Sequence, residues 1–183
     1  ILLKVSENPP VVWPEGKSIR DFVGPWWVAH TKSRNEKALA NDLINRGVSY
    51  FLPMSWKVRH IRGRKIKSLL PLFTGYVFFC GDESQRLSVL KTNRVASILS
   101  VTNQQQLLKE LVQIEQAIGA GVNLRPHKYI EQGQRCRVVS GPLAGIEGIV
   151  TETKNVTRLV LQVDMLGQAT SVEIETDLIE VIE

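Results

Sequence analysis

The most concentrated chemical groups in the sequence are cations. Residues 57–67 carry six lysines and arginines, one histidine, His60, and no acid. Such a segment attracts polyanions, and at a hairpin tip it would hold about three or four phosphates through counterion release. The alternative is a solvated loop whose charge keeps the protein soluble. Lys32, Arg34 and Arg94 add cations elsewhere in the basic part of the chain, which favours binding.

Catalytic chemistry has little support in the sequence. The three histidines, His30, His60 and His127, lie thirty or more residues apart, with no HExxH or GxSxG motif near them. Cys80 and Cys136 lack the CxxC spacing of a zinc site, so we expect buried, reduced thiols. Because no paired carboxylates or metal-ligand cluster appear, we predict that the protein is not an enzyme and holds no metal or cofactor.

The charge changes sign along the chain. Of the 183 residues, 43% are hydrophobic and 22% charged, as in globular proteins. Residues 1–130 carry 19 Lys and Arg against 9 Asp and Glu, whereas residues 131–183 carry 4 against 9. The basic part suits nucleic acid and the acidic part suits a basic protein surface. No apolar run approaches a membrane span and no export signal begins the sequence, so we expect a soluble, cytoplasmic protein.

The elements of the first part predict an antiparallel sheet with flanking helices. Ser33 and Glu36 have the spacing of a capping box, which predicts a helix start, and Gly47 supplies a left-handed residue that ends it. Between them, apolar residues recur at helical spacing at Leu39, Ala40, Leu43 and Ile44. Further helices are expected over residues 84–90 and 104–118. Strands are expected over residues 26–29, 48–52, 68–80 and 95–101.

Short β runs separated by glycines predict a small barrel in the second part. The expected strands are residues 135–140, 148–153, 158–163, 170–174 and 178–181. The fold class is therefore α+β, with an antiparallel sheet and flanking helices followed by a five-stranded β-barrel. The expected parts are a proline-rich loose arm (1–25), a sheet-and-helix domain (26–119), a linker (120–130) and the barrel (131–183).

The aromatic strand offers a possible protein-binding surface. Alternation places Tyr76 and Phe78 on one face, and Val77 and Phe79 on the other. One set can pack on helices while the other lies open as a patch, and the sequence leaves open which set is exposed.

Together these motifs resemble the NusG family of transcription elongation factors. The segments WWVAHTKSRNEKALANDL and PLFTGYVFF look like the family's amino-terminal (NGN) domain, and GQRCRVVSGPLAGIEGIV looks like a KOW motif. The stretch from Trp56 to Phe79 is also similar to RfaH, a specialised relative that acts on selected operons.

The resemblance implies a non-enzymatic factor that binds the RNA polymerase clamp and non-template DNA, suppresses pausing and recruits a partner through a permanently β KOW barrel. The partners implied are RNA polymerase, the non-template strand, and a small-subunit ribosomal protein or Rho, with no membrane. By resemblance, the polymerase-binding residues are His30, Phe73, Tyr76 and Phe78. The DNA-binding residues are Lys32, Arg34, Arg62, Arg64, Lys65 and Arg94. Leu143, Met165 and Leu166 stand in the partner-binding loops, where relatives carry aromatics.

One alternative remains beside this hypothesis, and one question remains within it. KOW barrels also occur in ribosomal proteins, so the chain could be a ribosome-associated RNA-binding protein. Within the NusG hypothesis, the sequence leaves open a general factor or an operon-specific antiterminator, and the arm and basic loop favour the specialised kind.

Overall fold

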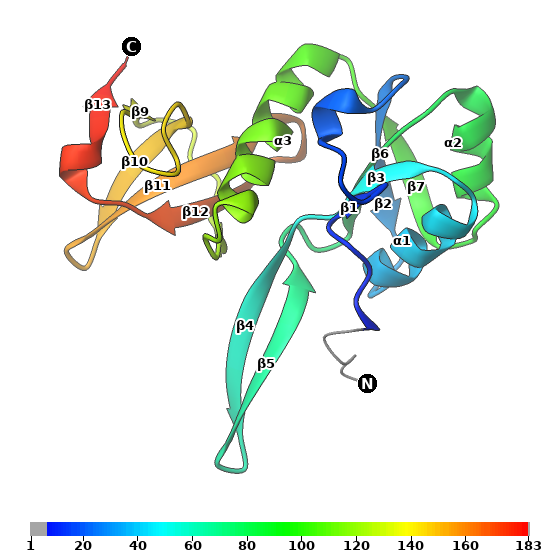
Figure 1. Ribbon diagram of the computed structural model, residues 1–183, viewed down its shortest axis with the longest axis horizontal. Helices are drawn as coiled ribbons and strands as arrows, with labels where there is room; N and C mark the ends of the chain where they lie inside the picture. Colours follow the sequence, from blue (N-terminus) through cyan, green and yellow to red (C-terminus); the bar gives the residue numbers. More distant parts are fainter. Residues whose placement is uncertain (1–6, 183) are drawn as a thin grey trace. The chain divides into compact units, whose positions relative to one another are not determined.

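The structure is a computed structural model that describes residues 7–182, in two compact units divided after Gln104. The first unit is built on a five-stranded antiparallel sheet with strand order β1-β3-β6-β2-β7 (Figure 1). Its strands are β1 (Val12–Trp13), β2 (Trp26–Thr31), β3 (Ser49–Phe51), β6 (Tyr76–Cys80) and β7 (Val95–Ser100). Two helices complete it, α1 (Glu36–Asn45) and α2 (Glu83–Leu90).

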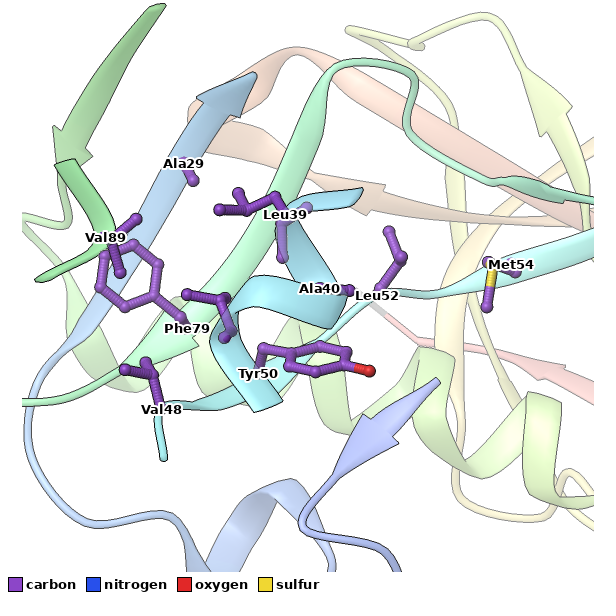
Figure 2. Close-up of a cluster of buried hydrophobic side chains, with 11 residues drawn as sticks. Ala29, Leu39, Ala40, Val48, Tyr50, Leu52, Met54, Phe79 and Val89 are labelled. Atoms are coloured by element: carbon purple, nitrogen blue, oxygen red, sulfur yellow. The ribbon is translucent and has the colours of Figure 1, made fainter. Parts of the chain in front are cut away.

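The core of the first unit joins α1 to the sheet. The apolar face expected for α1 is confirmed, because Leu39, Ala40 and Leu43 are buried. They pack with Tyr50 and Phe79 in one cluster of buried side chains (Figure 2). Each fully buried Leu or Phe side chain contributes about 1.5–3 kcal/mol of transfer free energy, so this cluster holds the helix on the sheet.

Part of the segment expected to be a loose arm, Val12–Trp13, is a strand of the sheet. β1 pairs with β3, and the Leu52 N–H donates to the Val11 carbonyl at 2.7 Å. The Tyr50 hydroxyl donates to the Pro10 carbonyl, also at 2.7 Å. A 3-10 turn, η2 (Ile19–Asp21), buries Ile19. The prediction was wrong here because prolines exclude a central strand but allow an edge strand such as β1. Residues 1–6 of the expected arm lie outside the described residues.

The basic segment forms a hairpin instead of a loop. Strands β4 (Met54–Ile61) and β5 (Arg64–Pro71) pair antiparallel in a sheet of their own, which extends from the five-stranded sheet in Figure 1. The strand expected over 68–80 is therefore two strands in different sheets, joined by residues 72–75. Gly75, at φ 87°, supplies the left-handed conformation at that junction.

The second unit is a six-stranded antiparallel sheet with helix α3 (Gln104–Gly119), whose first residue precedes the division of the chain. The strand order is β13-β9-β10-β11-β12-β8, with β13 and β8 at the ends. Each of the five expected strands is present, and β8 lies inside the expected linker. The strands are β8 (Arg125–His127), β9 (Gln134–Val138), β10 (Glu147–Thr153), β11 (Val156–Val163), β12 (Gln168–Glu173) and β13 (Ile179–Val181). The short turns are η3 (Asp164–Leu166) and η4 (Thr176–Leu178).

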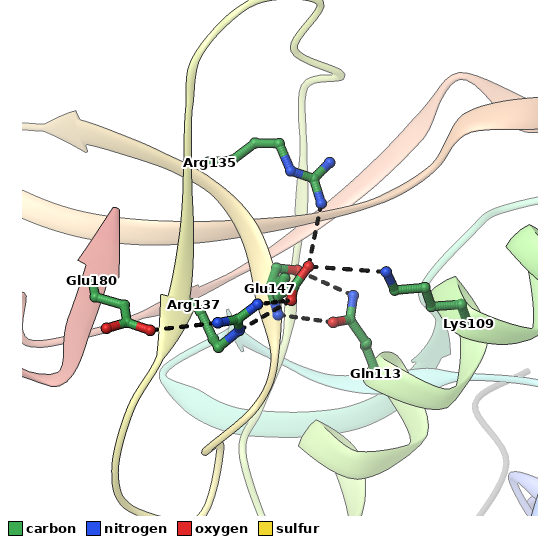
Figure 3. Close-up of polar contacts among 6 residues, drawn as sticks. All are labelled: Lys109, Gln113, Arg135, Arg137, Glu147 and Glu180. Atoms are coloured by element: carbon green, nitrogen blue, oxygen red, sulfur yellow. Dashed lines mark hydrogen bonds and ion pairs between the residues drawn. The ribbon is translucent and has the colours of Figure 1, made fainter. Parts of the chain in front are cut away.

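Polar contacts bond α3 to the start of β10. The side-chain amide of Gln113 donates to the Glu147 carbonyl at 3.1 Å and accepts from the Glu147 N–H at 2.8 Å. The Glu147 carboxylate accepts from Arg137 at 2.8 Å and lies 3.9 Å from the Lys109 ammonium (Figure 3). The hydrogen bond from Arg137 is the main cause that lowers the pKa of Glu147. The helix that the sequence groups with the first domain is thus bonded to the second unit.

The two cysteines match their prediction, because Cys80 and Cys136 are both free and buried. Burial raises the pKa of each thiol, which keeps both in the unreactive protonated form. Among the described residues, no helix is long and apolar enough to cross a membrane.

Glu110 on α3 should make the second unit less stable as pH rises. Its carboxylate accepts from the Asp164 N–H at 3.1 Å, and burial is the main cause that raises the pKa of Glu110 to about 7. A raised carboxyl pKa means that the folded state holds the proton more tightly than the unfolded state. The resulting stability is fully present below the ordinary glutamate pKa and is lost as pH rises through about 7.

We expect a loss of about 1 kcal/mol between pH 5 and pH 8, after allowing for solvent screening of this partly exposed group. Urea unfolding followed by NMR signals from β11 measures it. Glu110→Gln should remove the slope, whereas the exposed control Glu152→Gln should keep it. An unchanged slope in Glu110→Gln would contradict the assignment.

Candidate functional site

An exposed aromatic pair lies at the end of β2. His30 and Tyr76 face each other in the β2–β6 ladder, and their rings stack with centroids 5.1 Å apart and planes 20° apart. His30 is exposed and Tyr76 is half-buried. The pair presents a flat aromatic surface with polar edges, the kind of group that is enriched at protein interfaces.

A buried carboxylate fixes the loop beside this pair. Glu36 is only 6% exposed, and its Oε1 accepts from the Gly75 N–H at 2.8 Å. The Gly75 carbonyl in turn accepts from the Thr31 N–H at 2.8 Å. A Cβ added at Gly75 would lie 3.6 Å from the His30 ring. Glu36 and Gly75 therefore hold the loop against the two strands that carry the stacked pair.

Sequence reasoning missed this role of Glu36. The Ser33–Glu36 spacing predicts a capping box, but Asn35 is the N-cap and no side chain caps α1. The carboxylate bonds to a glycine 39 positions further along the chain. Only the unusual burial of a glutamate in the first helical turn signals the contact, and burial is visible only in the structure.

Phe73 and Phe78 are core residues and do not form the exposed patch that the sequence suggested. They are 1% and 0% exposed. The Phe73 ring meets the Phe78 ring edge-on with centroids 6.2 Å apart, and Phe51 lies 6.4 Å from Phe78. Both faces of β6 are buried along Val77–Cys80, so the alternation does not produce an open face. Of the four residues assigned to polymerase, His30 and Tyr76 alone reach the surface.

Cations follow His30 closely in the chain. Lys32 and Arg34 are exposed, and the Lys32 ammonium donates to Asn93 Oδ1 at 2.8 Å. Arg94 lies beside them, because its carbonyl accepts from the Lys32 N–H at 2.8 Å. The Arg94 guanidinium is bonded to Asp42 at 3.0 Å and to Asn35 at 3.2 Å, which restrains it. Lys32 and Arg34 are thus the accessible cations of this group.

The hairpin carries the second group of cations. All six of its lysines and arginines are exposed, and none forms an ion pair within residues 7–182. The tip turns through Arg62 at φ 51° and Gly63 at φ 73°, the two positive angles of a tight hairpin turn. The expected site residues Arg62, Arg64 and Lys65 therefore lie together at the tip, with Lys57, Arg59 and Lys67 along the arms. The sequence shows the arm cations, but the face of the hairpin on which each one lies follows only from the strand register.

The three residues expected to bind a partner of the barrel are divided by the structure. Leu143 is buried in the turn between β9 and β10 and contributes to the core. Met165 is exposed and Leu166 is half-buried, both in η3. Leu143 is therefore corrected to a structural residue, and only the η3 residues reach the surface. No group of three or more His, Cys, Asp or Glu side chains within the described range could hold a metal.

The comparison with protein families decides the classification. The family model described as "Transcription termination factor nusG" matches residues 24–116, just over half of the chain. The chain belongs to the NusG family. This confirms the resemblance drawn from the motifs and makes the protein a transcription termination or antitermination factor of that family.

Relatives in the family cover almost the whole chain. The transcription termination/antitermination protein NusG of Lactococcus lactis is 27% identical over 185 residues, covering 92% of this chain and 99% of its own. Its counterpart in Pseudomonas aeruginosa is 28% identical over 171 residues, covering 85% and 97%. A solved structure titled "Domain interaction in Thermotoga maritima NusG" aligns with 19% identity and a TM-score of 0.49, covering 87% of this chain and 97% of that one.

Replacing the buried carboxylate should loosen the aromatic pair. Glu36→Ala leaves the Gly75 N–H without its acceptor, so we expect the first unit to lose about 1–2 kcal/mol of stability. The NMR signals of the His30 and Tyr76 rings should also shift or broaden. Glu36→Gln keeps an oxygen acceptor and is the matched control, with ring signals close to those of the wild type. If both variants leave the ring signals unchanged, the loop is fixed by other contacts.

Proposed function

We propose that this chain acts on transcribing RNA polymerase as an elongation or antitermination factor. The observation that carries the proposal is the stacked His30–Tyr76 pair, with the exposed cations Lys32 and Arg34 close after His30 in the chain. An aromatic surface suits a protein partner and the adjacent cations suit phosphates. A surface that joins the two fits a partner that itself holds nucleic acid, such as polymerase at the edge of its transcription bubble.

In this proposal the aromatic pair contacts the polymerase clamp. Phe73 and Phe78 pack against each other in the core and take no direct part in this contact. Lys32, Arg34 and the cations at the hairpin tip, Arg62, Arg64 and Lys65, contact the phosphates of the DNA at the transcription bubble. Arg94 orders the 32–35 loop through Asn35 and its own backbone bond to Lys32, so its main role is to position the DNA-binding cations.

The second unit would recruit a further protein. We take its six-stranded sheet as a KOW-type barrel that stays β, with the exposed Met165 and the half-buried Leu166 as part of the contact surface. Residues 131–183 carry 4 cations against 9 acids, which suits a basic partner such as a small-subunit ribosomal protein, or termination factor Rho.

The test is retention of RNA polymerase by the full chain, together with pausing on defined templates. His30→Ala with Tyr76→Ala should weaken polymerase retention by about 30-fold, the effect of removing an aromatic hot spot. It should also abolish pause suppression. Val23→Ala is the matched control, because Val23 is 86% exposed in the same unit and lies outside the proposed surface.

Equal polymerase retention by the double variant and the control would contradict the proposed polymerase-binding surface. Templates that differ in non-template sequence separate a general factor, which responds little to base identity, from an operon-specific one. Salt-sensitive co-sedimentation with ribosomal subunits, with no effect on pausing, would support the ribosome-associated alternative instead.

A further inference from the structure

We propose that the β4–β5 hairpin is a ribbon that binds double-stranded DNA by entering its major groove. This deepens the proposed function, because it names the form of DNA that the hairpin takes and extends the contact from the tip to both arms. It does not require polymerase, so the two proposals can fail separately.

Both faces of the ribbon carry cations. The pairs Val58–Lys67 and His60–Lys65 place Lys65 and Lys67 on one face. The pairs Lys57–Ser68, Arg59–Ile66 and Ile61–Arg64 place three cations on the other face, Lys57, Arg59 and Arg64. A single strand lies along one face, whereas a groove has a phosphate wall on each side. Cations on both faces therefore fit a duplex groove.

The cationic part of the hairpin, residues 57–71, lacks aromatic rings on which bases could stack. Single strands without sequence preference are held by a positively charged groove together with aromatic rings on which the bases stack. The aromatic residue of the hairpin nearest to the cations is Trp56, at its base, and the Lys67 ammonium lies 4.5 Å from the centre of its ring. Residues 57–71 contain no Phe, Tyr or Trp, and His60 is the one imidazole among them. The arms thus offer charge without the rings that a single strand needs.

The ribbon also has a size that suits the major groove of DNA. Eight residues in each strand give a ribbon about 26 Å long, at roughly 3.3 Å per residue. A two-stranded ribbon fits the major groove of B-form DNA, which is about 12 Å wide, but the deep and narrow major groove of an RNA duplex excludes it. Val58 and Ile61, 44% and 45% exposed, lie on opposite faces and can contact thymine methyl groups there.

A simpler account is that the cations only protect the exposed edges of a two-stranded sheet from pairing with another chain. Protection of that kind works with charges of either sign. This chain has no acid at any position between Asp42 and Asp82, and none of the six hairpin cations is neutralised by an ion pair within the described range. A continuous positive field of that kind is what phosphate binding requires.

The test is fluorescence anisotropy of the full chain with a 20-base-pair DNA duplex, either of its single strands, and an RNA duplex of the same sequence, each over a series of salt concentrations. We expect the DNA duplex to bind at least tenfold more tightly than the single strands and the RNA duplex. The logarithm of affinity should fall with the logarithm of salt with a slope of about −4 to −5, for five or so neutralised phosphates.

Two double variants then separate the faces. Lys57→Gln with Arg59→Gln removes cations from one face, and Lys65→Gln with Lys67→Gln removes them from the other. Each should reduce the magnitude of the salt slope by about two. The two variants should weaken duplex binding to a similar extent. Lys17→Gln with Lys128→Gln removes the same charge from exposed positions outside the hairpin and should change the slope little. Lys65→Arg with Lys67→Arg should bind like the wild type.

The duplex proposal is overturned if single strands or the RNA duplex bind as tightly as the DNA duplex. It is also overturned if one face carries the whole loss, or if the control pair costs as much as the hairpin pairs. Polymerase retention by the wild-type chain keeps the two proposals apart. If the wild type retains polymerase but shows no preference for the DNA duplex, only the ribbon is overturned. If it prefers the duplex but does not retain polymerase, only the polymerase surface is overturned.

Discussion

The hydrogen bond from the Gly75 N–H to the buried carboxylate of Glu36 is the contact on which the surface of the first unit depends. A carboxylate in so little contact with water needs a partner, and a backbone N–H at 2.8 Å supplies one. Because Gly75 also accepts from Thr31, one residue connects the helix, β2 and the start of β6. The His30–Tyr76 stack is positioned where these three elements meet. It is therefore built on a helix and two strands, which hold side chains more rigidly than a free loop does.

Some charged side chains of the chain are neutralised by partners and others are not. In the first unit Arg94 pairs with Asp42, and in the second unit Glu147 pairs with Arg137, Arg135 and Lys109. The cations of the hairpin have no such partners among residues 7–182. Paired charges of this kind contribute mainly to local structure, whereas unpaired cations of one sign leave a field that extends to a ligand. The presence or absence of an ion-pair partner thus distinguishes structural cations from candidate binding cations, which the sequence alone does not.

Elements with a strong local period could be predicted from the sequence, and contacts between distant residues could not. The apolar repeat at Leu39, Ala40 and Leu43 specifies α1, and glycine-bounded β runs specify the sheet of the second unit. The strands of the hairpin were missed because Val58 and Ile61 lie on opposite faces of β4, so its apolar residues do not show the two-residue period of a strand. The exposed aromatic patch expected on β6 is smaller than predicted. Alternation shows which residues share a face of the strand, but it does not show that both faces are covered. The role of Glu36 depends on a partner 39 residues away, which no local pattern shows.

The tight turn at Arg62 and Gly63 limits which insertions and deletions the hairpin accepts. With two residues at positive φ closing the strands, every side chain of one arm faces a fixed partner on the other. A one-residue insertion in either arm would move all side chains beyond it to the opposite side. A change in the length of the ribbon that keeps both charged faces therefore adds or removes whole facing pairs.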